Sequence, residues 1–322
     1  MTAHLSAPAL DAATLKAATL LSRDLALQGA AANYNLDDRA EQARSGRDLS
    51  RLFFRLAKVL ETDLFVEAGA KDGASSRRAR RLLDPKRIVA FEANPFTYQL
   101  FESRNADPAL KVEYLHLALS DQPGNVTFNV LRNDDGKPRA DGRSSLLKRE
   151  SDLERGFEEV TVEATTIDTY LAGQEYERAA LWVDVEGAAQ QVLGGGRATL
   201  ERAAVVIIEV EDRRFWGAEQ WLRDDVTSYL YDRGLVAVAR DFQSRYQHNI
   251  VFVRDELLTV DRARWAITLF HSKAYAAGGA QTVSAERPPA LEERGTVLAR
   301  ELARRAVGKG RRTLARLSGK RG

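Results

Sequence analysis

Short apolar strands alternate with helical segments through the middle of the chain, and this order constrains the fold more than any other feature. Strand-like runs cover residues 64–66, 87–91 and 112–117, with a helical pattern after each of the first two. The alternation resumes with strands at 180–185 and 205–210. Because parallel strands need crossover connections, which are usually helices, this order predicts an α/β fold built on a doubly wound, Rossmann-like, mostly parallel sheet.

The last part of the alternating region predicts the edge of that sheet. A helix at about 218–233 is followed by strands at 235–239 and 250–253, with only a short connection between them. Adjacent strands of this kind predict an antiparallel hairpin at the sheet edge. The stretch 126–162 is less regular, and two strand-like pieces in it flank the polar loop 133–145. A long loop inside an α/β domain is commonly functional.

The first sixty residues are predicted to be helical. Apolar side chains recur there at three- and four-residue spacing, which places on one helix face Leu49, Leu52, Phe53, Leu56 and Leu60. We expect a helical cap beside the α/β domain, and a dimerisation arm or a lid over the substrate are the alternatives. The predicted organisation is a helical extension (1–62), the α/β domain (63–258), a linker or helical segment (259–296) and a basic tail (297–322).

Composition excludes several kinds of site. The chain has no cysteine, so disulfides, thiolate zinc sites, iron–sulfur clusters and cysteine nucleophiles are impossible. Its four histidines lie far apart without ligand spacing, so a metal site built on histidine is not predicted. No apolar run approaches the roughly 20 residues of a membrane-spanning helix, and no basic leader precedes the first apolar stretch. We therefore predict a cytoplasmic protein.

Positive charge is concentrated at the C-terminal end. Residues 297–322 carry nine Lys and Arg against one acid, a local charge of +8, which leaves −6 for the rest of a chain whose formal charge is +2. An acidic body argues against a protein that binds nucleic acid over its whole face, and we predict no specific nucleic-acid partner. Two interpretations of the tail stay open, which are contact with an anionic membrane from the cytoplasmic side and a solvated, disordered tail.

The segment after the first strand has the pattern acid-x-Gly-x-x-x-Gly, formed by Glu67, Gly69 and Gly73. Lys71 breaks the dinucleotide fingerprint, and no Walker sequence follows, so nothing here provides for a pyrophosphate. Glu92 ends the second strand, where a carboxylate can accept hydrogen bonds from both hydroxyls of a ribose. A nucleoside with a zwitterionic tail fits this combination, and we predict S-adenosyl-L-methionine as the cofactor. A tight strand–helix turn is the structural alternative for the loop.

Acidic residues mark a second candidate site. Asp184 and Glu186 stand where a central strand leaves the sheet, and carboxylates there can accept a proton or bind an amine or a cation. Glu186 has an alternative role as the cap of a helix predicted at 188–200. Glu209 lies inside an apolar strand; the three acids together could hold a divalent cation, although we predict a site without metal. His248 precedes the last strand and is a further candidate base, with a structural role as its alternative.

These motifs resemble the FkbM-type family of S-adenosylmethionine-dependent O-methyltransferases over residues 63–254. The Phe-acid-x-Asn-Pro and Asp-x-Glu-Gly pieces are fairly specific, whereas many methyltransferases share the glycine loop. The resemblance rests on Val66-Glu67-Ala68-Gly69-Ala70-Lys71-Asp72-Gly73, Ala90-Phe91-Glu92-Ala93-Asn94-Pro95, Ala118-Leu119-Ser120-Asp121, Thr166-Ile167-Asp168 and Val183-Asp184-Val185-Glu186-Gly187-Ala188. It implies a seven-stranded, doubly wound class I methyltransferase sheet and methyl transfer to hydroxyl groups, commonly of sugars or polyketides.

The resemblance also implies roles for individual residues. The cofactor contacts that it implies are Glu67, Gly69, Ala70, Lys71 and Gly73 for the methionine part, Glu92 with Ala93 and Asn94 for the ribose, and Leu119 with Ser120 for the adenine. Asp184 and Glu186 line the implied reaction centre, and Asp184 also contacts the cofactor. The chain departs from the family at Lys71, where the family usually has Asn, and at Ala189, where the family often has an acid after Glu-Gly-Ala.

These features predict an O-methyltransferase that acts on a hydroxyl group of a sugar, glycan or glycolipid. The expected base is Asp184 or Glu186, with His248 as the third candidate. One alternative is a nucleic-acid methyltransferase that uses the basic tail, although the chain has no base-flipping motif of the Asn-Pro-Pro-aromatic type. The other alternative is a non-catalytic binding module of the same fold. The oligomeric state is not predicted.

Overall fold

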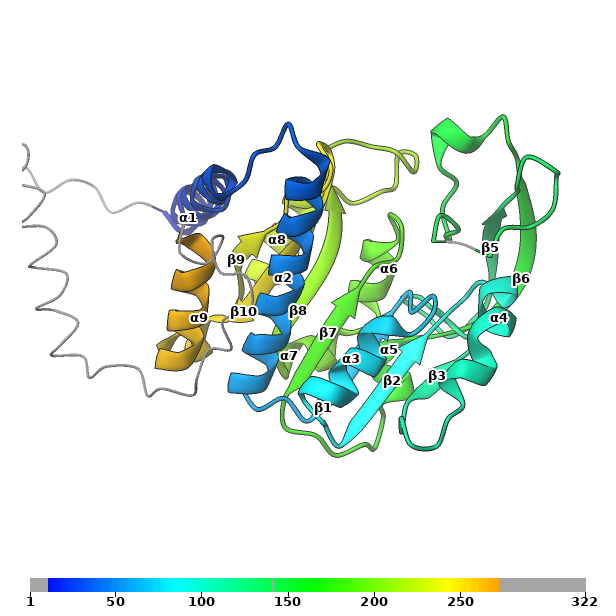
Figure 1. Ribbon diagram of the computed structural model, residues 1–322, viewed down its shortest axis with the longest axis horizontal. Coiled ribbons are helices and arrows are strands. Elements are labelled where there is room, and N and C mark those ends of the chain that lie inside the picture. Colours follow the sequence, from blue (N-terminus) through cyan, green and yellow to red (C-terminus); the bar gives the residue numbers. More distant parts are fainter. Residues whose placement is uncertain (1–10, 141, 273–322) are drawn as a thin grey trace, which may run out of the picture. The chain divides into compact units, whose positions relative to one another are not determined.

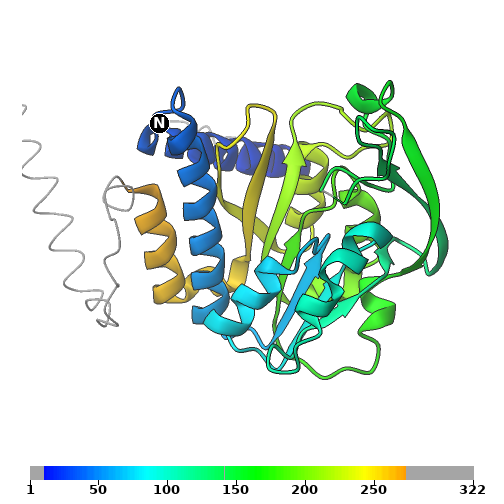
Figure 2. The ribbon, with the colours of Figure 1, turned by 45° about the vertical axis from the view of Figure 1, so that its right-hand side comes forward.

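The computed structural model describes residues 11–140 and 142–272, and its centre is a seven-stranded sheet (Figures 1 and 2). In spatial order the strands are β3 (Glu113–Leu115), β2 (Arg87–Phe91), β1 (Leu64–Ala68), β7 (Ala179–Val183), β8 (Ala203–Glu211), β10 (Gln247–Arg254) and β9 (Leu235–Arg240). Only β10 runs antiparallel to its neighbours, β8 and β9. The predicted mostly parallel sheet with an antiparallel hairpin at one edge is confirmed.

Helices cover both faces of this sheet, as the doubly wound prediction requires. One face is covered by α2 (Arg39–Val59), α3 (Ala74–Leu82) and α9 (Asp261–His271). The other face is covered by α5 (Ile167–Tyr170), α6 (Ala189–Gly194), α7 (Arg197–Glu201) and α8 (Arg223–Tyr231), with Leu27 of α1 (Ala12–Gly29). Burial of apolar side chains on both faces explains why the central strands are predominantly apolar.

The N-terminal helix α2 forms part of this layer. Asp38 caps it by accepting a hydrogen bond of 2.8 Å from the backbone N–H of Ala40. The five apolar residues predicted to share a face of the helical extension are all buried, and Phe53 packs edge-on against Phe65 of β1. Helix α9 packs on the same face through Ala263, Ala266 and Phe270. The packed core therefore continues past residue 258, where we predicted a boundary.

A second, smaller sheet occupies the region that the sequence left less regular. Strands β4 (Ala118–Leu119), β6 (Phe157–Thr165) and β5 (Gly124–Leu131) lie side by side, with β5 and β6 antiparallel. Phe128, Val130 and Val162 form a core of their own with Phe96 of α4 (Pro95–Asn105). The small sheet stands beside the main one on the β3 side (Figure 1).

Two predicted helices differ from the structure for local reasons. The helix expected at 188–200 is two helices, α6 and α7, because the chain turns at Gly195 and Gly196. A Cβ on Gly195 would lie 2.1 Å from the carbonyl oxygen of Ser120, so only glycine fits there. The helix expected from 218 begins at Arg223, because Gln220 Oε1 accepts the backbone N–H groups of Phe215 and Trp216 and holds a loop instead.

No helix among the described residues is long and apolar enough to span a membrane. Short 3₁₀ turns at Ala30–Asn33, Glu150–Asp152 and Asp255–Thr259 complete the secondary structure of the described residues. The predicted basic tail (297–322) and most of the segment 259–296 lie outside the described residues.

Candidate active site

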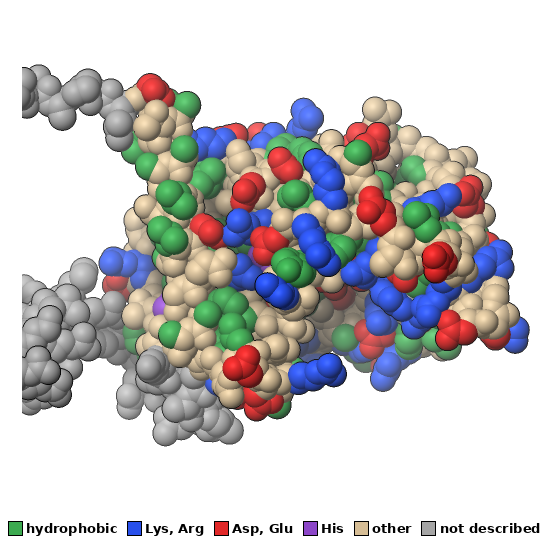
Figure 3. Space-filling model, turned by 90° about the horizontal axis from the view of Figure 1, so that it is seen from above, with side chains coloured by type: hydrophobic (Ala, Val, Ile, Leu, Met, Phe, Trp, Pro, Cys, Tyr) green, Lys and Arg blue, Asp and Glu red, His purple; other side chains and the backbone are tan. Residues whose placement is uncertain are grey.

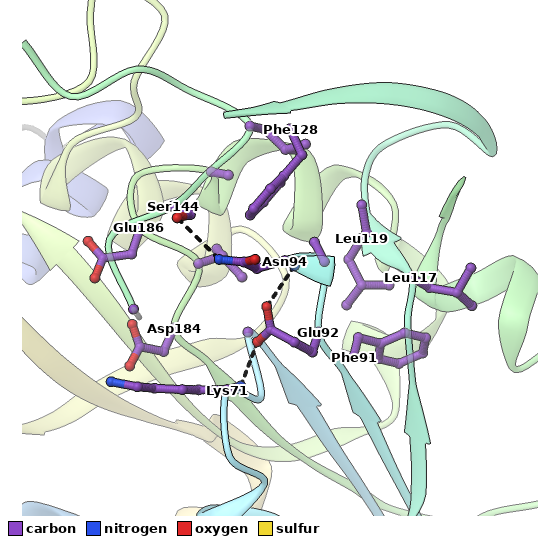
Figure 4. Close-up of a pocket in the computed structure, with 17 residues that line it drawn as sticks. Lys71, Phe91, Glu92, Asn94, Leu117, Leu119, Phe128, Ser144, Asp184 and Glu186 are labelled. Carbon is purple, nitrogen blue, oxygen red and sulfur yellow. Dashed lines mark hydrogen bonds between the residues drawn. The ribbon is translucent and has the colours of Figure 1, made fainter. Parts of the chain in front are cut away.

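The loops after β1, β2 and β7 meet at the carboxyl edge of the sheet and line one pocket (Figure 4). Open α/β sheets bind ligands at this edge. The sequence-predicted residues that the structure brings together in the pocket wall are Gly69, Lys71, Glu92, Ala93, Asn94, Leu119, Asp184 and Glu186. Most of the predicted site is therefore assembled around a single cavity.

Glu92 is held in the pocket wall by backbone amides. Its Oε2 accepts a hydrogen bond of 2.6 Å from Lys71 N–H, and its Oε1 accepts one of 2.7 Å from Asn94 N–H. The residue is only 7% exposed, and burial raises its pKa to about 7, although these amides and the Lys71 ammonium favour the ionised form. Asn94 in turn caps α4 with its side chain. Glu92 therefore presents a fixed carboxylate whose remaining lone pairs can accept hydroxyl groups.

Gly69 joins the ends of three strands. Its backbone has a φ of +77°, and a Cβ there would lie 1.8 Å from the carbonyl oxygen of Asp184. Its N–H donates to the carbonyl of Phe91, at the end of β2. Any side chain at position 69 would push the β1 loop away from Asp184. The glycine of the predicted loop is thus required where β1, β2 and β7 come together.

Four carboxylates gather where β7 and β8 end. Asp184 and Glu186 follow β7, and Glu209 and Glu211 lie two residues apart on β8, so their side chains point to the same face. One oxygen from each of Asp184, Glu186 and Glu209 lies within 4.8 Å of the others. Gly187 makes the turn after Glu186 with a φ of +84°. A Cβ there would lie 2.5 Å from the Trp216 ring, so the position requires glycine.

Burial raises the pKa of each of these four carboxyls. Repulsion by neighbours within the group raises it further for Glu186, Glu209 and Glu211, and the charge of Asp241 does so for Asp184. Lys71, whose side chain runs alongside Asp184 in Figure 4, lowers the pKa of Asp184 in opposition. Neither Lys71 nor Arg149 forms an ion pair with any of the four. Glu209 accepts a hydrogen bond of 2.8 Å from Gln247, and Glu186 Oε2 is buried without a donor. Glu211 faces the side-chain N–H groups of Gln220 and Trp216, which lower its pKa in opposition to burial.

Segments from the small sheet and from the loop after β8 surround the mouth of the site. Seen from above, Lys and Arg side chains gather on the side of the small sheet, beside a hollow (Figure 3). Arg149 stacks over Phe215 at 5.1 Å and over Trp216 at 5.5 Å, and its charge lowers the pKa of Glu186. The four carboxylates of Asp184, Glu186, Glu209 and Glu211 thus form an acidic floor of the site, and Arg149 belongs to a partly basic rim.

Several predicted cofactor residues lie outside the pocket wall. Glu67 is 3% exposed and its Oε2 accepts hydrogen bonds from the backbone N–H and hydroxyl of Ser76, so it joins β1 to α3. Ala70 and Gly73 shape the turn between β1 and α3 without lining the pocket. Ser120 donates its backbone N–H to the carbonyl of Thr165 and also lies outside the wall.

His248 is not placed with the acids. It pairs across the strands with Val210, and its neighbour Asn249 pairs with Glu209, so its ring points to the opposite face of the sheet. The ring is 1% exposed, and Nδ1 lies 3.6 Å from Asp212 Oδ2. Burial lowers the pKa of His248 to about 3, with help from the positive charges of Arg240 and Arg223. His248 does not line the pocket, so the structure gives its candidate role as a base no support.

Other residues of the wall were not predicted individually. Phe128 comes from β5, Ser144 lies in the polar loop 133–145, Leu146 directly follows that loop, and Leu117 follows β3. Asn94 Nδ2 donates to the carbonyl of Arg139 at 2.9 Å, which fastens that loop over the pocket. The length of the loop was the sequence signal for its role.

Residues 67–237, more than half of the chain, match the model of the family described as Methyltransferase FkbM domain. The chain belongs to the FkbM methyltransferase family. FkbM methyltransferases use S-adenosyl-L-methionine, which is therefore the cofactor of this domain. The pocket at the ends of β1 and β2 offers the carboxylate and the apolar side chains that a nucleoside requires.

One curated relative and two solved structures show how far the similarity extends. The chain is 24% identical over 192 residues to the 2-O-methyltransferase NoeI of Sinorhizobium fredii, covering 57% of this chain and 79% of the relative. A methyltransferase FkbM structure from Methylobacillus flagellatus is 13% identical with a TM-score of 0.39; the match covers 60% of this chain and only 44% of that one. A putative tRNA (m1A22) methyltransferase from Streptococcus pneumoniae, solved with S-adenosyl-L-methionine, is 11% identical with a TM-score of 0.36. The match covers 63% of this chain and 72% of that one.

Proposed function

We propose that this FkbM domain transfers a methyl group from S-adenosyl-L-methionine to a hydroxyl group of a sugar or glycan. The observation that carries the proposal is the carboxylate pair Asp184 and Glu186, which lines the cofactor pocket and continues into the acidic floor beside it. A sugar hydroxyl is weakly acidic, so its methylation needs a group that removes the hydroxyl proton. The printed activity of the NoeI relative, 2-O-methylation, supports an oxygen acceptor.

In the proposed binding mode, Glu92 accepts hydrogen bonds from the ribose hydroxyls. Leu117, Leu119 and Phe128 offer an apolar slot for the adenine. Gly69 and Lys71 lie between the ribose position and Asp184, which is where the methionine part would extend. Of the loop residues carried over from the family, Gly69 and Lys71 are the ones whose atoms line the pocket, so they carry the proposed contacts.

In the proposed reaction, a lone pair of the acceptor hydroxyl attacks the methyl carbon of the sulfonium. The carbon–sulfur bond breaks with its electron pair going to sulfur, which leaves S-adenosylhomocysteine and a methyl ether. The hydroxyl proton passes to the carboxylate of Asp184 or Glu186, whose pKa burial raises toward neutrality. The protein contributes mainly alignment of the oxygen, the methyl carbon and the sulfur.

The acceptor class can be tested by the chemistry of the product. The protein would be incubated with methyl-labelled S-adenosyl-L-methionine and, separately, with extracted glycans, glycolipids and RNA. We expect label in the glycan or glycolipid fraction that survives mild alkali, since methyl ethers resist conditions that cleave methyl esters. Label confined to RNA would overturn the proposal, and cofactor binding without label in any fraction would favour a non-catalytic module.

A further inference from the structure

Three arginines and three aromatic side chains form a continuous stack beside the acidic floor, in which cations and rings alternate. We call this stack the arginine–aromatic ladder. Its members, in order from the floor outward, are Trp216, Arg149, Phe215, Arg213, Tyr246 and Arg245. Between each member and the next, the guanidinium carbon of the arginine lies 4.1–5.5 Å from the centre of the ring. Cation–π contacts of this kind hold an arginine in place without neutralising its charge.

Backbone hydrogen bonds join the segments that carry the ladder. These segments are the chain at the 3₁₀ turn between β5 and β6, the loop after β8, and the loop between β9 and β10. The N–H of Glu150 donates to the carbonyl of Phe215, and the N–H of Asp212 donates to the carbonyl of Tyr246, both at 2.8 Å. The ladder is therefore built on a platform that the fold itself holds together.

The inner end of the ladder lies at the reaction centre, and its outer end lies in solvent. Trp216 is 2% exposed and packs against the turn after Glu186, where a Cβ on Gly187 would lie 2.5 Å from its ring. The side chains of Arg213 and Arg245, by contrast, are exposed. A ligand that contacts the outer arginines can thus extend along the ladder to the acidic floor.

The charges of the ladder are not balanced by carboxylate partners. Within residues 11–140 and 142–272, none of its three arginines forms an ion pair. The Nε of Arg149 is buried without a hydrogen-bond acceptor. The floor balances Arg149 in part, since its charge lowers the pKa of Glu186, but Arg213 and Arg245 stand further out. An arginine stacked on a ring keeps N–H groups at its edge that fit the oxygens of a phosphate, sulfate or carboxylate.

We propose that the ladder binds an anionic group of the methyl acceptor, a phosphate, sulfate or carboxylate, while a hydroxyl of the same molecule reaches Asp184 and Glu186. This inference rests on the proposed function and narrows its acceptor to an acidic glycan or a sugar joined to phosphate. The acidic floor repels the anionic group and the ladder attracts it, so the two surfaces orient the acceptor with its neutral hydroxyl toward the cofactor.

The same geometry favours a saccharide over a nucleic acid. Proteins that bind single-stranded nucleic acid stack its bases on aromatic faces. In the ladder, Phe215 and Tyr246 each hold two arginines, so their rings carry guanidinium groups and are not offered to a base. A ligand meets the edges of the guanidinium groups, which recognise anions.

Calorimetry on the full chain saturated with S-adenosylhomocysteine tests the ladder without methyl transfer. The anionic titrants are UDP-N-acetylglucosamine, which carries a diphosphate, hyaluronan tetrasaccharide, which carries carboxylates, and a sulfated chondroitin tetrasaccharide. Neutral chitotetraose is the reference. We expect saturable binding of at least one anionic titrant, roughly tenfold or more tighter than that of chitotetraose and weakened by added salt.

Arg213→Gln should weaken this binding roughly tenfold or more, because it removes charge-assisted hydrogen bonds to the anionic group. The matched control is Arg262→Gln, which removes one positive charge from an exposed residue of α9 outside the ladder and should bind as the wild type does. Circular dichroism would establish that each variant is folded, and Arg245→Gln takes the place of Arg213→Gln if the latter does not fold.

Absence of saturable binding for all three anionic titrants, or wild-type affinity in the glutamine variant, would overturn the proposal. Binding of a single-stranded RNA decamer in place of the saccharides would also overturn it and assign the ladder to nucleic acid. Methyl transfer to a neutral glycan that is unchanged in Arg213→Gln removes the role of the ladder and leaves the proposed function standing. Binding of an anionic saccharide that depends on Arg213, without transfer to any hydroxyl, does the reverse.

Discussion

The two halves of the site treat their carboxylates in opposite ways. In the cofactor half, at the ends of β1 and β2, both oxygens of Glu92 accept backbone amides. In the acceptor half, at the ends of β7 and β8, Glu186 keeps a buried Oε2 without a donor. A carboxylate that the fold itself satisfies is ready to bind a neutral ribose. A carboxylate oxygen that the fold leaves unsatisfied is suited to the proton that leaves the acceptor hydroxyl in the proposed reaction.

The largest effect should come from Asp184, which borders both halves. Asp184→Asn keeps the shape of the side chain but removes its charge, so we expect turnover to fall about 10²-fold or more while the thermal midpoint stays nearly unchanged. Methyl transfer to the identified acceptor, measured alongside thermal unfolding, checks this. A large loss of midpoint, with normal activity in the fraction that stays folded, would instead make Asp184 a structural residue.

A substitution at Glu92 should weaken binding of the cofactor and leave the carboxylates of the acidic floor unaffected. Loss of charge-assisted hydrogen bonds to the ribose in Glu92→Ala should cost about 1.5–3 kcal/mol, or roughly ten- to hundredfold in affinity for S-adenosylhomocysteine. Calorimetry on the wild type and the variant measures it, with Glu154→Ala on the surface as the control. Equal affinities would show that the cofactor half does not depend on this carboxylate.

Glu67 gives a reference for a carboxylate enclosed by the fold. Burial raises its pKa from the ordinary value of 4.5 to about 7, although Ser76 donates two hydrogen bonds to it. The folded protein then binds more protons than the unfolded chain between these values, so its stability falls as the pH rises from about 4.5 to 7. Glu67→Gln should lessen that fall by roughly 2–3 kcal/mol. Denaturant unfolding across this pH range checks it, and an unchanged slope would contradict it.

A substitution at Gly69 tests how much the contact between the cofactor half and the acceptor half contributes to the free energy of unfolding. Gly69→Ala forces a side chain into a positive φ and against the Asp184 carbonyl, and we expect a loss of about 1–3 kcal/mol in the free energy of unfolding. Gly29→Ala is the control, since nothing lies within 4 Å of a Cβ there, and it should be neutral or slightly stabilising. If both variants unfold alike, the contact between the halves is not a constraint.

The sequence predicted the sheet well because its signals are local. Apolar runs, turns and helical spacing each lie within a few residues, and crossover rules convert their order into a parallel sheet. Glu92 and Asp184 were found in the same way, since both stand directly after strands. The face of the sheet to which a given side chain points was harder to predict. His248 and Glu67 lie on strands longer than predicted, and a change of one residue reverses the direction of a side chain.

Contacts between distant segments were not accessible from the sequence. Phe128 and Ser144 reach the pocket only because the small sheet stands beside the main one, and no local pattern encodes that placement. The convergence of Glu209 with Asp184 and Glu186 depends on the register between β7 and β8, in which Val183 pairs with Ile208. The acids themselves were recognised, but their joint geometry required the fold.

The segment that closes over the pocket has a kinetic consequence. Asn94 holds it through the Arg139 carbonyl and the Ser144 hydroxyl, and Ser145 donates its hydroxyl to the carbonyl of Val185 beside the acids. In the proposed binding mode the nucleoside lies beside this segment, so we expect these contacts to loosen whenever cofactor and spent cofactor exchange with solvent. The strength of these three hydrogen bonds would then bear on how fast the enzyme can start its next cycle.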